Sequence, residues 1–150
     1  MTTKPLQTWL DAYAESHKNS TNKAIHYICV PLIFFTIVGL LMSIPPLFLQ
    51  DILPSGMANW ATIALALAML FYLRLSFLLA LKMLVFSSGC IILNQYISNF
   101  ISLFTFSIIV FTTAWIGQFY GHHIEGKKPS FLKDLQFLLI GLAWVMNKLF

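Results

Sequence analysis

The sequence predicts an all-α integral membrane protein in which a single transmembrane domain, residues 1–150, forms a bundle of about four transmembrane helices. Hydrophobic residues make up 59% of the chain and charged residues only 9%, and the mean hydropathy is +0.81. Soluble domains carry about 25% charged residues, and a chain of this length still exposes about 30% of its unfolded surface after folding. The charge is therefore too sparse for a water-facing surface, and long uncharged runs indicate membrane spans.

The N-terminal segment predicts a helix that lies on the membrane surface. Residues 6–17 (LQTWLDAYAESH) place four apolar side chains at helical spacing, opposite polar ones, which is typical of an interfacial amphipathic helix. Residues 18–21 (KNST) are typical of a turn, and Ser20 or Thr21 is expected to cap the next helix.

The first span is expected within residues 24–50, which contain no charged residue. Residues 28–44 are almost continuously apolar, and a span needs about 20 apolar residues. Pro45 and Pro46 follow this run, and we expect them to end the helix.

Three further spans are expected in the middle of the chain. The second begins near Met57 and is interrupted by Arg74. Residues 83–121 carry no charge, and as one helix they would be about 58 Å long, about twice the thickness of the hydrocarbon core. This run must therefore turn back once, and spans three and four flank the turn. The polar residues expected at this corner are Asn94, Gln95, Ser98 and Asn99.

The C-terminal residues 131–150 combine apolar residues with Lys133, Asp134 and Lys148. These charges predict an interfacial or shallowly inserted helix.

The positions of the basic residues support four spans. With the N-terminus inside, the two outer loops hold Asp51 and neither Lys nor Arg, as the positive-inside rule requires. The inner segments hold Lys4, Lys18, Lys23, Arg74, Lys82, Lys127, Lys128 and Lys133. We therefore expect the N-terminus and the histidines on the cytoplasmic side. The membrane is the inner membrane in a bacterium, or the endoplasmic reticulum membrane in a eukaryote.

The net charge of +4 does not indicate a nucleic-acid partner. The basic residues form no dense stretch interleaved with accessible aromatic residues, and their positions better suit contact with anionic membrane lipid.

Four spans bring the entry to span one and the exit from span four to the same face of the membrane. The first polar cluster there consists of Tyr13, His17, Asn22 and His26. On one continuous helix the two histidines would point apart by about 180°. The turn at residues 19–21 removes this constraint, so that both rings can face inward.

The second cluster consists of Gln118, His122 and Glu125. His122 and Glu125 share a helix face, whereas His123 is rotated away by about 100°. The two clusters together supply imidazoles and a carboxylate. Such a set with open coordination positions suits non-haem ferrous iron, and zinc also fits.

Other roles remain open for these residues at this point. A histidine beside the membrane is often only an amphipathic interfacial residue. Glu125 could pair with Lys127 or Lys128, or form hydrogen bonds with the backbone at the end of span four. The chain could be a small carrier or channel subunit whose histidines handle protons or a metal, or a purely structural partner. A carrier is expected to place ionisable residues near the middle of its spans, whereas these lie at the ends of spans one and four.

Two longer motifs resemble those of a family of small polytopic membrane proteins. In HKNSTNKAIHYICVPLIFF, a histidine, an Asn-containing turn, a second Asn and a second histidine precede a span with a proline. In WIGQFYGHHIEGKKPSFLKDLQFLLIG, Gln-Phe is followed by Gly-His, a glutamate and a proline. The family includes the endoplasmic-reticulum 2-hydroxy fatty acid dioxygenase of phytosphingosine catabolism, and this chain is more similar to its bacterial members. Ser20 and Leu142 stand where the family pattern has prolines.

The resemblance implies an Fe(II)-dependent dioxygenase of alpha-oxidation that uses molecular oxygen to shorten a 2-hydroxy fatty acid by one carbon. It implies that the iron ligands are His17, His26 and His122. Asn22 and Glu125 would be ligands or would orient them, and both are candidate catalytic residues together with Tyr13. The acyl chain is expected to stay in the bilayer or between helices. We expect Lys23, Lys127 or Lys128 to attract the substrate carboxylate.

Overall fold

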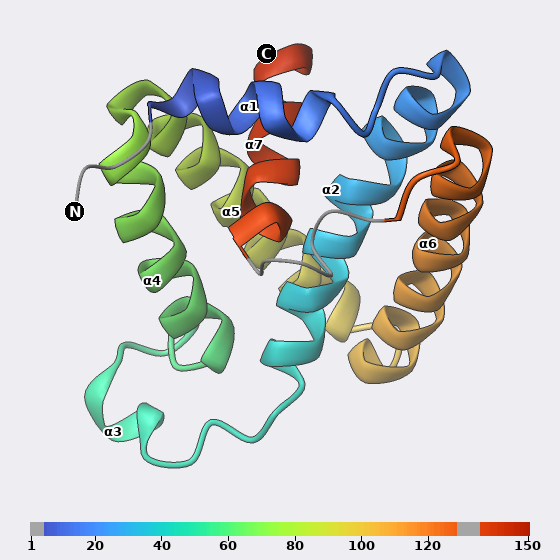
Figure 1. The fold of residues 1–150 in the computed structure, drawn as a ribbon. Helices are drawn as coiled ribbons and strands as arrows, with labels where there is room; N and C mark the ends of the chain where they lie inside the picture. Colours follow the sequence, from blue (N-terminus) through green and yellow to red (C-terminus); the bar gives the residue numbers. More distant parts are fainter. Residues whose placement is uncertain (1–4, 129–135) are drawn as a thin grey trace.

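The structure is a computed structural model that describes residues 5–128 and 136–150, and each regular element in these ranges is an α-helix (Figure 1). The all-α fold class is therefore confirmed. The helices are α1 (Leu6–Ala14), α2 (Ser20–Met42), α3 (Leu49–Ile52), α4 (Trp60–Leu75), α5 (Phe77–Ser98), α6 (Leu103–Glu125) and α7 (Gln136–Leu149).

Three of the described helices, α2, α5 and α6, are long and apolar enough to cross a membrane. The helix α4 is also apolar but has 16 residues, fewer than the roughly 20 of a typical span. The outward faces of these helices carry large apolar side chains that are 57–66% exposed, for example Leu67, Leu70, Ile92, Ile109 and Ile116. Water-facing surfaces rarely carry such contiguous apolar area, so these faces suit contact with lipid.

The long helices run alternately in opposite directions, and α1 lies across the end of the bundle where α2 begins and α6 ends (Figure 1). Among the described helices, α2 and α6 make the most extensive contact. The sequence explains several helix starts, because a polar side chain caps each one. Asn19 caps α2 by accepting from the backbone N–H groups of Thr21 and Asn22. The cap predicted at Ser20 or Thr21 is therefore wrong by one or two positions.

The helix ends on the same side as α1 carry most of the basic residues, as the sequence predicts (Figure 1). Asp51 lies in α3, at the other end of the bundle. Lys4 and Lys133 lie outside the described residues. The basic residues on the α1 side lie at the start of α2, the end of α4, the start of α5 and just after α6: Lys18, Lys23, Arg74, Lys82, Lys127 and Lys128.

The corner between α5 and α6 falls at residues 99–102, so the predicted reversal is confirmed with a later position. Asn94 is not part of this corner, because it is fully buried inside α5. Its amide donates to the carbonyl of Phe35 in α2 over 3.1 Å and to that of Cys90 over 2.9 Å. Polar side chains in membrane helices commonly join neighbouring helices in this way.

The C-terminal helix is enclosed by the bundle, so the prediction of an interfacial or shallowly inserted helix is wrong for its described part. Residues 140–146 of α7 are all buried. The helix packs against α1, α2 and α5 and crosses α1, beyond which its last turn extends (Figure 1). The hydroxyl of Tyr72 in α4 donates to the carbonyl of Leu139 over 2.9 Å. Two of the charges that suggested an interfacial position, Lys133 and Asp134, lie outside the described residues, and Lys148 is in the last turn.

Replacing Asn94 with alanine removes both hydrogen bonds to backbone carbonyls. We expect the free energy of unfolding to fall by about 1 kcal/mol, as for other polar contacts between membrane helices. Titration with a denaturing detergent, followed by circular dichroism, measures this change. Asn99→Ala at the exposed corner is the matched control, and an equal loss in both variants would contradict the proposed tie between α5 and α2.

Candidate metal centre

Three histidines from separate segments meet at the end of the bundle covered by α1. His17 lies in the connection between α1 and α2, His26 in α2 and His122 in the last turn of α6. Their exposed fractions are 1%, 1% and 6%. One ring nitrogen from each lies within 4.8 Å of the others. The convergence predicted from four spans is therefore present, whereas His123 is exposed and outside this group.

Backbone carbonyls fix two of the three rings. The Nδ1 atom of His17 lies 2.7 Å from the carbonyl oxygen of Tyr13, and that of His26 lies 2.9 Å from the carbonyl oxygen of Asn22. A carbonyl oxygen only accepts hydrogen bonds, so each Nδ1 carries the proton and donates it. Each Nε2 is then left with a free lone pair, which is how metal-binding histidines are commonly oriented.

The Nε2 atoms face a common space. The Nε2 atoms of His26 and His122 are 3.1 Å apart, and the buried Nε2 of His17 has no hydrogen-bond partner among the described residues. A metal with nitrogen ligands at about 2.1 Å and tetrahedral or octahedral angles separates neighbouring nitrogens by about 3.0–3.4 Å. A buried nitrogen without a partner costs about 1–3 kcal/mol, and a bound metal would remove that cost. His26 and His122 therefore have the spacing of two ligands of one metal ion, and a nitrogen of His17 lies within 4.8 Å of both.

The surroundings of His17 favour its neutral form. Burial lowers the pKa of this imidazole below its ordinary value, and the positive charge of Lys23 acts in the same direction. The hydrogen bond to Tyr13 and the charge of Glu125 oppose this effect without reversing it. Because only the neutral imidazole binds a metal, His17 is prepared for ligation near neutral pH.

Glu125 connects the end of α6 to the segment that carries His17. Its Oε1 accepts from the backbone N–H of Lys18 over 3.0 Å, and its Oε2 accepts from the backbone N–H of Asn19 over 2.9 Å. The Oε2 also accepts from the side-chain amide of Asn22 over 3.0 Å. A carboxylate is favoured at this place, the N-terminus of α2. These three bonds tie the last turn of α6 to the turn that follows His17.

The described hydrogen-bond partners of the Glu125 carboxylate do not include Lys127 or Lys128. The ammonium of Lys127 instead donates to the carbonyl of Glu15 over 3.1 Å. This contact is reached because Gly126, with a positive φ of 72°, ends α6 immediately after Glu125 and turns the chain.

Asn22 joins the carboxylate to a histidine. It is fully buried, its amide donates to Glu125, and its backbone carbonyl accepts from the Nδ1 of His26. The same amide lies 3.4 Å from the carbonyl of Ser16, beside His17. A shift of Asn22 would therefore change the positions of both His17 and His26.

Two glycines of α6 allow it to approach α2 closely. A Cβ at Gly121 would lie 2.5 Å from the Oδ1 of Asn22, and one at Gly117 would lie 2.9 Å from the Sγ of Cys29. The sequence GQFYG places them four residues apart, the small-residue spacing of closely packed membrane helices. The sequence analysis missed this motif, although the spacing alone could have found it.

Aromatic rings cover one side of His17. The ring of Tyr13 stacks on it at 4.2 Å between centroids, and the ring of Trp144 lies 5.5 Å from both. The sequence analysis named Tyr13 but missed Trp144, because it assigned α7 to the membrane surface. These rings shield the histidine from water on this side.

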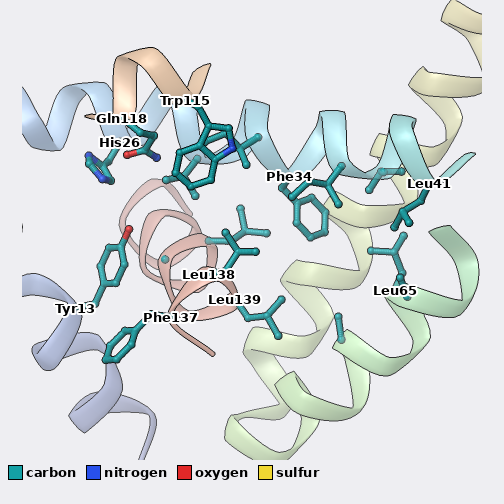
Figure 2. A pocket seen from close by; sticks show the side chains of 18 of the residues that line it. Tyr13, His26, Phe34, Leu41, Leu65, Trp115, Gln118, Phe137, Leu138 and Leu139 are labelled. Carbon is teal, nitrogen blue, oxygen red and sulfur yellow. The ribbon is translucent and has the colours of Figure 1, made fainter. Parts of the chain in front are cut away.

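Two cavities adjoin the histidine group. An apolar cavity begins at Tyr13, His26 and Gln118 and continues along α2 to Leu41 and Leu65 (Figure 2). His122 also lines this cavity, whereas His17 lines a second, polar one. The polar cavity is lined further by charged residues and by two aromatic residues: Asp11, Lys23, Lys148, Tyr27 and Trp144.

The chain matches the model of a known protein family. The model of the Mpo1-like family, described as 2-hydroxy-palmitic acid dioxygenase Mpo1-like, matches residues 3–150. No curated protein and no solved structure shows a significant match. The resemblance inferred from the two motifs is therefore confirmed over nearly the whole chain.

A methyl group at position 121 should disturb the histidine group without touching a histidine. In Gly121→Ala, the new Cβ displaces Asn22 or separates α2 from α6, so we expect metal affinity to fall about 10–100-fold, as for other residues that orient ligands. Titration of metal-free protein with ferrous iron under anaerobic conditions measures the affinity. Gly89→Ala is the matched control, because no atom lies within 4 Å of its Cβ position. Equal affinities in the two variants would refute the role given to the close approach.

Proposed function

The chain belongs to the Mpo1-like family, and on this premise we propose that it is an iron-dependent membrane dioxygenase that converts 2-hydroxy fatty acids into fatty acids one carbon shorter. One observation carries the proposal. Three buried imidazoles turn nitrogen atoms to a common space, and backbone carbonyls hold two of them in the metal-binding tautomer. The family description names 2-hydroxy-palmitic acid, which has the polar head and apolar tail that the two cavities suit.

In this proposal His17, His26 and His122 hold the metal, and Asn22 and Glu125 keep the ligands in place. Three imidazole ligands would leave coordination positions open to the carboxylate and hydroxyl of the substrate. When bound, ferrous iron supplies the electron exchange through which molecular oxygen reacts with the substrate. Zinc would fit the same imidazoles but has no redox chemistry, which favours iron for this reaction class.

The overall reaction balances without an external reductant. A 2-hydroxy acid, R–CH(OH)–COOH, and O₂ give R–COOH, CO₂ and H₂O. The bond between C1 and C2 breaks, C2 is oxidised to a carboxyl group, and C1 leaves as carbon dioxide. The four electrons released reduce one molecule of oxygen fully, so the protein needs to provide only a metal, an ordered substrate and a water-poor site.

Side chains beside the histidines can orient the head group. The buried Oε1 of Gln118 has no hydrogen-bond partner among the described residues and adjoins the apolar cavity. It is suited to accept from the 2-hydroxyl group of the substrate. Lys23 lines the polar cavity beside His17 and would attract the carboxylate. Tyr13, at the start of the apolar cavity, would contact the head group and exclude water.

We further propose that α2, α4, α5 and α6 all cross the membrane, with the histidine group on the cytoplasmic side. At 1.5 Å per residue α4 is about 24 Å long, somewhat shorter than a typical hydrocarbon core, and a bilayer accommodates such a mismatch by local thinning. The basic residues at the ends near α1 support this orientation. The membrane would be the bacterial inner membrane or, in a eukaryote, that of the endoplasmic reticulum.

Metal content and turnover test the proposal together. After anaerobic reconstitution, we expect about one iron per chain in the unchanged protein and a loss of iron in the His17→Ala, His26→Ala and His122→Ala variants. With iron, 2-hydroxy palmitate should yield pentadecanoate and consume one O₂ per product. Mass spectrometry and an oxygen electrode measure these two quantities.

His123→Ala is the control, because this neighbour of His122 is exposed and should keep both iron and activity. Circular dichroism checks that each variant folds. Bound iron without turnover of any 2-hydroxy acid would overturn the enzymatic proposal and favour a carrier of metal. Absence of iron in the folded, reconstituted protein would overturn the metal site itself.

A further inference from the structure

The apolar cavity has polar groups at one end only. Tyr13, His26, Gln118 and His122 stand at that end, and beyond them the walls are formed by apolar side chains of α2, α4 and α7 (Figure 2). A molecule with one polar head and one long apolar tail can enter such a cavity in a single orientation. Its head would lie at the histidines and its tail would run along α2.

The length of the cavity corresponds to a long acyl chain. It follows α2 from His26 to Leu41, and this stretch of helix rises by about 22 Å at 1.5 Å per residue. A fully staggered acyl chain advances about 1.25 Å per carbon, so the stretch of α2 that the cavity follows corresponds to the length of about 17 carbons. This length agrees with the palmitic acid named in the family description.

Two small residues of α4 line the cavity at different depths. Ala64 and Ala68 are half-buried and lie on the face of α4 toward α2. The two helices run in opposite directions (Figure 1). Ala68 therefore lies nearer the histidine end of the cavity than Ala64. The core clusters agree with this order, because Ala68 packs against the cluster that contains Tyr72, whereas Leu65, beside Ala64, belongs with Val38 to the cluster farther from the histidines. The two alanines are separated by about 6 Å along the helix, which equals about five carbons of an acyl chain.

We propose that this cavity is the acyl-chain channel of the enzyme and that Ala68 and Ala64 determine the longest chain it accepts. The inference rests on the proposed function and adds residues that determine specificity. The small side chains leave space beside α2 in which methylene groups fit. A larger side chain at either position blocks the channel at its own depth and leaves the head-group end unchanged.

Phenylalanine at each position tests the depth order. In Ala68→Phe, turnover of 2-hydroxy palmitate relative to 2-hydroxy decanoate should fall at least tenfold. In Ala64→Phe the longest accepted chain should be about four or five carbons longer than in Ala68→Phe. The Ala64→Phe variant should therefore still convert 2-hydroxy dodecanoate. Ala66→Phe is the matched control, since Ala66 is exposed on the same helix, and its chain-length profile should equal that of the unchanged protein.

A binding measurement separates failure of the channel from failure of the proposed function. The shift in thermal unfolding midpoint caused by 2-hydroxy acids of eight to eighteen carbons is recorded for all four proteins, with and without iron. The channel predicts that the shift stops increasing at a shorter length in Ala68→Phe than in Ala64→Phe. The same profile in all four proteins refutes the channel, even if turnover occurs. The predicted binding order without turnover of any acid supports the channel and refutes the oxygenase.

Discussion

The close approach of α2 and α6 is the constraint on which the rest of the site depends. At Gly117 and Gly121 the side chains of α2 occupy space that a Cβ of α6 would need. The approach brings the Nε2 atoms of His26 and His122 to 3.1 Å. It also brings Glu125 to the N-terminus of α2, where its carboxylate accepts hydrogen bonds from the backbone N–H groups of the two residues that follow His17. One helix contact thus positions all three imidazoles.

The site divides the molecule into a polar side and an apolar side. His17 faces a cavity with charged side chains, while His26 and His122 face the apolar cavity that follows α2. The buried helix α7 separates much of this space from its surroundings and supplies Trp144, whose ring lies beside His17. An amphiphilic molecule suits this division, because its head can reach the three histidines while its tail remains in apolar surroundings.

Much of the fold and the histidine group could be predicted from the sequence. Uncharged runs and the distribution of basic residues are direct consequences of the bilayer, and an even number of spans requires His26 and His122 to share one face. The charges of Lys133, Asp134 and Lys148 predict a surface position for the C-terminal helix, and hydropathy cannot correct this, because it does not distinguish an apolar helix that faces lipid from one enclosed by protein. For the same reason Asn94 was assigned to a corner, although it binds the carbonyl of Phe35 inside the bundle. The bonds of Glu125 depend on tertiary positions that no local pattern encodes.

X-ray absorption at the iron edge of the reconstituted protein tests the central claim most directly. The account predicts a coordination sphere with three imidazoles and otherwise oxygen ligands. In a His17→Ala variant loaded with iron at an elevated iron concentration, it predicts one imidazole fewer. The outer-shell scattering of the imidazole rings reports their number. A sphere with sulfur from Cys29 or Cys90, or one made of oxygen alone, would contradict the assignment of His17, His26 and His122 as the ligands.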